Sequence, residues 1–344
     1  MRPATGLAGA GVLLTAYASL HPLSGWRASG AGVFDFLFAS WPRYTTGFDI
    51  AANIAIYLAL GFLLYSALRQ ALRSTIAVVA AMIGGCLLSF SMEFLQNFLP
   101  SRVPSNLDLA SNSLGTLLGV LIALRWNPLL VNGGRIEYAW RRLAAEGRGL
   151  DSGILVMGLW LLAQTNPHNL LFGAGELRPM LGLGPAQPFS AERFMLLEAA
   201  VTAFGLLAAA LLAALFLRRH RRTTAYSLLL GGLLAKTAGI ALIEGPNAAL
   251  VWLTPGAAVG LLIGGVLVLV VAALKRSLQR ALAALTLLLL TALTNLMPDN
   301  PYLVSGLPAF PAAQWLNFNG LTQLAGAIWP FVTLTWLMTL HTDE

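Results

Sequence analysis

The sequence predicts an all-α membrane protein, a polytopic bundle of about ten transmembrane helices. Of its 344 residues, 57% are hydrophobic and only 10% are charged, whereas soluble domains carry about 25% charged residues. Long apolar segments recur along the whole chain, and about 20 such residues suffice to cross the hydrocarbon core of a bilayer. Lys and Arg are dense in every second loop, as in multi-pass membrane proteins.

Ten segments are apolar and long enough to be predicted as spanning helices. They are residues 6–24, 50–68, 75–98, 106–125, 153–171, 195–217, 225–244, 247–273, 278–297 and 323–341. The first segment resembles a signal peptide, but it offers no small-residue cleavage site, because its Ala-rich part precedes Tyr17, His21 and Pro22. We therefore expect it to be a retained helix.

The distribution of Lys and Arg predicts the orientation. With the N-terminus inside, the cytoplasmic segments contain fifteen of these residues and the opposite side contains five. This bias predicts a multi-pass protein of the cell (inner, cytoplasmic) membrane with both termini in the cytoplasm. It also accounts for the net charge of +7, since basic loops such as 217–222 and 275–280 serve as topology anchors. No basic run is interleaved with aromatic residues, so we do not expect nucleic-acid binding.

The basic segment 126–152 is the predicted boundary between two membrane domains. A four-helix domain, residues 1–125, precedes it, and a six-helix domain of unknown role, residues 153–344, follows it. The segment itself is predicted to be a cytoplasmic connector, and its amphipathic part, 136–145, is expected to lie in the membrane interface.

Three helices of the first domain place their acidic residues near the same, outer end. Each acid shares a helix face with an amide: Asp49 with Asn53, Glu93 with Gln96, and Asp108 with Asn112. The loop between the third and fourth helices brings Arg102 back over this end. Ionisable groups at a membrane are costly and are by default candidates for function.

Glycines in the same helices are predicted to let the backbones approach closely. Gly115 and Gly119 have the GxxxG spacing, and Gly61 lies on the second helix. Close packing would hold the three acids around one pocket, where the planar fork of Arg102 can bind a carboxylate or a phosphate. The four histidines have no metal-ligand spacing and the single cysteine, Cys86, does not supplement them, so neither a metal nor a cofactor is expected.

A purely structural interpretation is also available for most of these residues. Asp49, Ser105 and Asn106 can be N-caps, Arg102 can fix its loop, and Asn53 and Asn112 can hydrogen-bond between helices. This interpretation explains Glu93 poorly, because that residue lies within a helix among apolar neighbours, where no capping role is expected. The set as a whole therefore favours a functional site.

The pattern of these residues resembles the VanZ-like family. It reads D-x3-N on the second helix, then E-x2-Q, a loop with Pro and Arg, and S-N-x-D-x3-N-x2-G-x3-G, over residues 10–125. The family consists of integral membrane proteins, some associated with low-level resistance to the glycopeptide antibiotic teicoplanin. The resemblance carries over to Asp49, Asn53, Glu93, Gln96, Arg102, Asp108, Asn112, Gly115 and Gly119. Asn106 departs from it, since many relatives have an acid there, and this weakens any paired D-x-D site.

The preferred hypothesis is that the first domain binds or remodels a cell-envelope amphiphile at the outer rim of the membrane. The partner would be a membrane lipid or a lipid-linked envelope precursor, and the resemblance implies a link to teicoplanin resistance. Arg102 would hold an anionic group, while Asn53, Gln96 and Asn112 would bind hydroxyl groups.

Two alternatives remain open. In the first, the same pocket is an enzyme in which Glu93 or Asp108 acts as general acid or base on a lipid-linked substrate. No recognisable nucleophile, metal signature or nucleotide motif accompanies it. In the second, the chain is a transporter whose pathway includes Lys236, Glu198 and Glu244, although a charge pair that only stabilises the bundle is the preferred interpretation of these residues. The sequence leaves the oligomeric state open.

Overall fold

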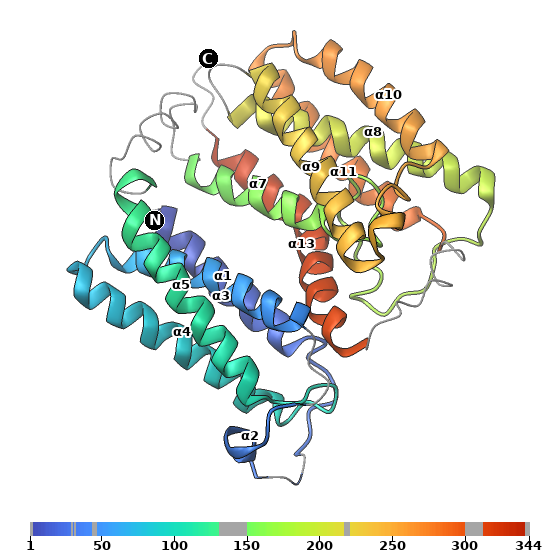
Figure 1. Cartoon of the computed structure of the whole chain (residues 1–344). Coiled ribbons are helices and arrows are strands. Elements are labelled where there is room, and N and C mark those ends of the chain that lie inside the picture. The colour runs from blue at the N-terminus through green and yellow to red at the C-terminus, as the bar shows by residue number, and fades with distance from the viewer. Residues whose placement is uncertain are drawn as a thin grey trace. The chain divides into compact units, whose positions relative to one another are not determined.

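The computed structural model describes residues 3–28, 30, 32–42, 47–130, 150–216, 221–299 and 312–340 (Figure 1). Within these ranges the regular structure consists of eleven α-helices and one short 3-10 helix, without strands. The predicted all-α class is therefore confirmed. The chain divides into two compact units, residues 1–140 with 311–321 and residues 141–310 with 322–344, and each is described separately.

Seven helices of the described ranges are long and apolar enough to cross a membrane: α3, α4, α5, α8, α9, α11 and α13. The helices α1, α7 and α10 are also apolar, but they are shorter. Each of the ten predicted segments overlaps one of these ten helices. Their length and composition identify a multi-pass membrane protein.

Unit 1 is a bundle of four helices: α1 (Pro3–Leu20), α3 (Gly47–Leu68), α4 (Ser74–Gln96) and α5 (Asn106–Leu130). The short helix α2 (Asp35–Phe38) contacts α5. The most extensive contact in the unit is between α3 and α5, and α4 packs against both of them. Figure 1 shows α2 beside the end of the bundle at which α5 begins.

Unit 2 is organised around α8 (Ala191–Phe216), which contacts α9 (Arg221–Ile243), α10 (Pro255–Val271) and α11 (Arg276–Leu296). In the most apolar 18-residue stretch of α8, 83% of the residues are buried, as expected for a helix that is hydrophobic on all sides. The unit also contains α7 (Leu150–Gln164), the 3-10 helix η1 (Pro246–Ala248) and α13 (Ala312–Thr339) from Thr322 onwards.

Several predicted boundaries are wrong, and two of these errors trace to proline. The fifth segment was expected to reach residue 171, but α7 ends at Gln164, just before Asn166-Pro167. The eighth was expected to begin at residue 247, but η1 and turns occupy that stretch and α10 begins at Pro255. Helix α5 continues to Leu130, and α13 begins at Ala312, eleven residues earlier than predicted. The predicted interfacial piece, 136–145, lies outside the described residues.

Candidate functional site

The first turn of α5 is held by side chains from two helices. Ser105 is its N-cap: its Oγ accepts hydrogen bonds from the backbone N–H groups of Leu107 (3.1 Å) and Asp108 (3.4 Å). The backbone N–H of Ser105 in turn donates to Glu93 Oε2 on α4, at 2.8 Å. Glu93 is only 3% exposed. The expectation that Glu93 has no capping role is therefore wrong, because it caps a neighbouring helix rather than its own.

Asp108 connects α5 to α3. Its Oδ1 accepts a hydrogen bond from Asn53 Nδ2 at 3.0 Å, so the pair joins the beginnings of the two helices. Buried Asp49, one turn before Asn53 on α3, lies within electrostatic range of Asp108, and Asp108 lies within that range of Glu93. The structure thus brings the three predicted acids, from three helices, to one end of unit 1.

Arg102 contacts both the cluster and the end of α1. Its Nε donates to the backbone carbonyl oxygen of His21 at 2.9 Å, and its Nη2 donates to the same oxygen. The guanidinium also interacts electrostatically with Glu93. Burial lowers the pKa of Arg102 to about 10, and the negative charge of Glu93 opposes this shift, so the group stays positive at neutral pH. Arg102 fixes the chain just after α1 and supplies a cation beside the acids.

The two remaining predicted amides bond to other partners. Gln96 Nε2 donates to the backbone carbonyl of Ser19 at 3.0 Å, near the end of α1. Asn112 Nδ2 donates to Ser89 Oγ on α4 at 2.9 Å, and its Oδ1 is buried without a partner in the described part of the chain. Neither bond reaches the acids, so the structure groups Asp49, Asn53, Glu93, Arg102 and Asp108 but gives Gln96 and Asn112 interhelical contacts.

The predicted packing glycines all lie at the α3–α5 contact. A Cβ at Gly61 would overlap the carbonyl oxygen of Thr116, and one at Gly119 would overlap that of Leu58. A Cβ at Gly115 would lie 2.5 Å from the carbonyl oxygen of Ile54. Only glycine permits the short distance between these two helices. The short distance in turn holds the acids at the beginnings of α3 and α5 near each other.

Sequence reasoning missed several residues that hold the site in place. Asn97 Nδ2 donates to the carbonyl of Val33 at 3.1 Å, and Asn106 Nδ2 donates to that of Ala39 at 2.6 Å. Both bonds fix the connection after α1 to the end of α4 and the beginning of α5. On α4, a Cβ at Gly85 would lie 2.5 Å from Thr116 Cγ2. The Gly84-Gly85 pair could have predicted this close contact. The backbone carbonyls that accept from Asn97 and Asn106 could not be predicted, because every residue has one.

Among the described residues, Lys236 interacts electrostatically with Glu244, whereas no salt bridge to Glu198 is formed. Lys236, 1% exposed, donates to three backbone carbonyls beyond α7: those of Asn166 (2.6 Å), Pro167 (3.1 Å) and Asn169 (2.5 Å). Glu198 lies instead beside Thr254, the N-cap of α10. A carboxylate is favourable at that helix terminus. Lys236 therefore holds an irregular, mostly buried segment by bonding to backbone carbonyls that no helix satisfies.

No group of three or more His, Cys, Asp or Glu side chains in the described ranges is arranged to hold a metal ion. What the cluster in unit 1 offers is a set of carboxylate acceptors beside one guanidinium. Such acceptors bind hydroxyl and amino groups, and charge-assisted bonds of this kind are stronger than neutral ones.

Comparison with known proteins gives one match. No curated protein and no solved structure matches the chain significantly. Residues 9–129, which contain α3, α4 and the whole carboxylate cluster, match the VanZ/LLP1 family model. The resemblance inferred from the sequence is confirmed for this segment: residues 9–129 are similar to the VanZ/LLP1 family.

Proposed function

We propose that the VanZ-like segment binds the headgroup of a cell-envelope amphiphile, a membrane lipid or a lipid-linked envelope precursor. One observation carries the proposal: Asp49, Glu93 and Asp108 come from three helices to one end of the bundle. Burying carboxylates is costly unless they are hydrogen-bonded, and caps alone do not require three of them together. Sugar hydroxyls and amino groups are the donors that such a cluster binds.

The surrounding residues have positioning roles in this proposal. Asn53 orients Asp108, and the backbone N–H of Ser105 orients Glu93. Arg102 holds the chain after α1 through the carbonyl of His21, so this proposal gives it a positioning role rather than that of the main ligand of an anionic headgroup. Its charge instead limits the mutual repulsion of the acids.

The proposed location of this site is the outer face of the cell (cytoplasmic) membrane, with both chain termini in the cytoplasm. The alternation of Lys and Arg between loops supports this orientation. Single cysteines in a Cys86→Ser background test it with a membrane-impermeant maleimide. Cysteine in place of Val103, which is 84% exposed, should react in intact cells. Cysteine in place of Lys275 should react only after lysis, and the reverse pattern would invert the topology.

The function itself is tested by teicoplanin susceptibility, to which the VanZ-like resemblance points. We expect expression of the chain in a susceptible host to reduce susceptibility, and Glu93→Gln, Asp108→Asn and Asp49→Asn each to abolish this effect. Glu192→Gln, at an exposed acid in the first turn of α8, is the control. Protein levels in membranes are measured in parallel. A full effect from the three cluster variants at normal protein level would contradict the proposal.

Binding can be measured directly as well. The purified chain should retain a lipid-linked peptidoglycan precursor, and Asp108→Asn should weaken that retention. Loss of one hydrogen bond to a charged group costs about 1.5–3 kcal/mol, which corresponds to roughly a tenfold to hundredfold change in affinity. Equal retention by the wild type and by Asp108→Asn would place the ligand elsewhere.

The enzyme alternative rests on the different surroundings of two acids. Glu93 is 3% exposed, whereas Asp108 is only partly buried, and carboxylates in unlike environments can divide acid and base roles. Incubation of the purified chain with a lipid-linked precursor distinguishes the two functions. Turnover that Glu93→Gln abolishes without loss of binding would establish catalysis, and binding without turnover would support recognition alone.

A further inference from the structure

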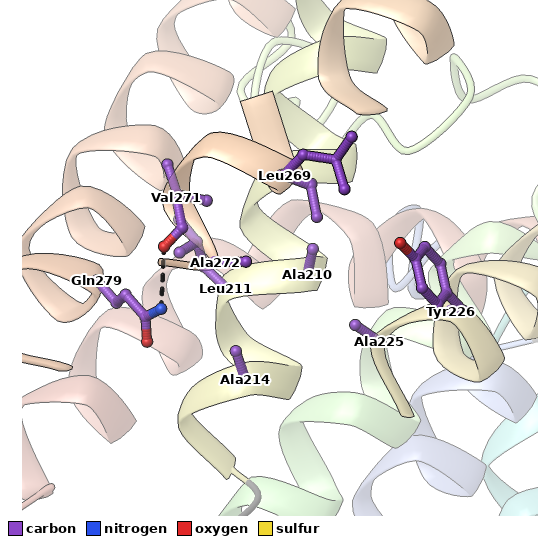
Figure 2. A pocket seen from close by; sticks show the side chains of 10 residues that line it. Ala210, Leu211, Ala214, Ala225, Tyr226, Leu269, Val271, Ala272 and Gln279 are labelled. Carbon is purple, nitrogen blue, oxygen red and sulfur yellow. Dashed lines mark hydrogen bonds between the residues drawn. The ribbon is translucent and has the colours of Figure 1, made fainter. Parts of the chain in front are cut away.

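Unit 2 has a hollow between α9 and α10. Both helices pack on α8, and two cavities of about 140 and 290 Å³ lie over it. The two cavities share Tyr226 of α9 and Val268 of α10. Figure 2 shows the smaller one, with Ala210 and Ala214 of α8 between Tyr226 and the end of α10. The two cavities together are called the α9–α10 groove below.

The α9–α10 groove is almost entirely apolar and opens onto the surface of unit 2. Apart from Tyr226 and Gln279, its lining consists of Ala, Leu, Val, Gly and Phe. Leu230 and Leu269 at its walls are 57% and 63% exposed. An apolar cavity of about 150 Å³ suffices to bind benzene. In a membrane, the hydrocarbon that meets such an opening is the acyl chain of a lipid.

One end of the α9–α10 groove carries an unsatisfied polar group. Gln279 is 1% exposed and its Nε2 donates to the carbonyl of Val271 at 3.0 Å. Its Oε1 is buried without a hydrogen-bond donor in the described part of the chain. A buried carbonyl oxygen without a donor is unfavourable. Gln279 lies in the first turn of α11, next to the α10–α11 turn (Figure 2), where the polar part of a lipid would begin.

The sequence around that end is cationic and contains no acid. Segments 199–243 and 245–298 include no Asp or Glu. Lys275 is exposed at the N-cap of α11, and Arg276 follows it. Clusters of Lys and Arg at a membrane surface attract anionic lipid headgroups.

We propose that the α9–α10 groove holds an acyl chain of an anionic phospholipid. The phosphate of this lipid lies near Lys275, and a hydroxyl of its headgroup donates to Gln279 Oε1. The site is separate from the carboxylate cluster of unit 1 and does not depend on the function proposed for that cluster. The apolar lining alone would accept any acyl chain, so the selectivity comes from the cationic end.

Gly265 provides the variant that blocks the α9–α10 groove. It lines the larger cavity, and a Cβ there would meet nothing within 4 Å, so a larger side chain extends into the groove without striking the backbone. Gly158 on α7 is the matched control, because its Cβ would also meet nothing within 4 Å. The full chain is purified in detergent and incubated with phosphatidylglycerol, and native mass spectrometry counts the retained lipid.

We expect Gly265→Phe to lower phosphatidylglycerol retention about tenfold through lost apolar contacts, and Gly158→Phe to retain it like the wild type. Lys275→Glu should lower retention about fivefold or more, unlike Arg73→Glu, which changes the net charge equally in unit 1. Phosphatidylcholine with the same chains should be retained less, and glycerol 3-phosphate should not displace the lipid. If Gly265→Phe unfolds at a lower temperature than the wild type, Gly265→Leu is used in its place.

Four results would overturn the proposal. The first is unchanged retention in a folded Gly265 variant. The second is equal retention of phosphatidylglycerol and phosphatidylcholine, which would remove the role of the cationic end. The third is displacement by glycerol 3-phosphate, which would indicate a headgroup site without an acyl chain. A dimer that Gly265→Phe dissociates would likewise replace the lipid with a second copy of the chain.

Discussion

Gly119→Ala tests whether the close α3–α5 contact holds the carboxylate cluster together. A Cβ at this position would overlap the carbonyl oxygen of Leu58 and lie 2.8 Å from the backbone nitrogen of Phe62. Because the obstructing atoms belong to the backbone of α3, no change of rotamer makes room. The helices must move apart by roughly 1 Å to relieve this overlap, and a gap of about that size forfeits up to about half of the dispersion attraction of each separated atom pair.

The expected loss of stability follows from two opposing contributions. Overpacking typically costs about 1–3 kcal/mol, and the rigid backbone places this site at the upper end. Replacing Gly by Ala within a helix returns about 1 kcal/mol. The net destabilisation should therefore be about 2 kcal/mol. Gly84→Ala on α4 is the matched control, because the nearest atom to its Cβ is Leu64 Cδ1 at 3.9 Å.

Unfolding of both variants in mixed micelles, followed by circular dichroism over an SDS titration, gives the comparison. Gly84→Ala should be as stable as the wild type or slightly more stable. Gly119→Ala should unfold earlier, and it should also lose teicoplanin protection, since Asp108 lies on the same helix three turns away. Equal stability of the two variants would refute the packing argument.

Two further predictions concern stability. Lys236→Met leaves three backbone carbonyls without their donor and should destabilise unit 2 by about 2–5 kcal/mol, from roughly 0.6–1.7 kcal/mol per hydrogen bond in a membrane. Lys275→Met is the control for SDS unfolding, and equal stability of the two variants would contradict this role of Lys236. Burial, and then Arg102, lower the pKa of His21 below 6.5. The unfolded chain therefore binds the proton first, so stability should fall below about pH 6.5, and His21→Gln should reduce that dependence.

The helices were predictable because apolar length is a direct physical requirement of the bilayer. The residues at which the helices end were harder to predict, and the region after α7 shows the reason. Leu170, Leu171 and Phe172 are apolar, so the pattern extended the fifth segment to residue 171. The structure uses them in an irregular segment instead, where Lys236 and Gln164 bond to its backbone. Hydropathy predicts that a residue is buried, but it does not predict whether the backbone of that residue is helical.

The sequence predicted which acids lie close together in the candidate site. It did not predict the hydrogen-bond partners of the residues around them. Helical spacing placed Asp49 and Asn53 on one face, because i and i+4 share a face. Asp108 was placed beside them because it lies at the same end of its own helix. The partners of Arg102 and Gln96 are the backbone carbonyls of His21 and Ser19. Every residue carries a carbonyl, so no side-chain pattern marks these two as acceptors.

The beginning of α5 shows why structural and functional interpretations of Glu93 are not exclusive. Ser105 and Asp108 have the spacing of a capping box, in which the acid at the third helical position accepts from the N-cap backbone N–H. Here Glu93 of α4 accepts that hydrogen bond instead. Asp108 is thereby released from its own helix, and it accepts from Asn53 on α3 and lies near Asp49. The cap supplied by Glu93 is thus what makes Asp108 available to the cluster.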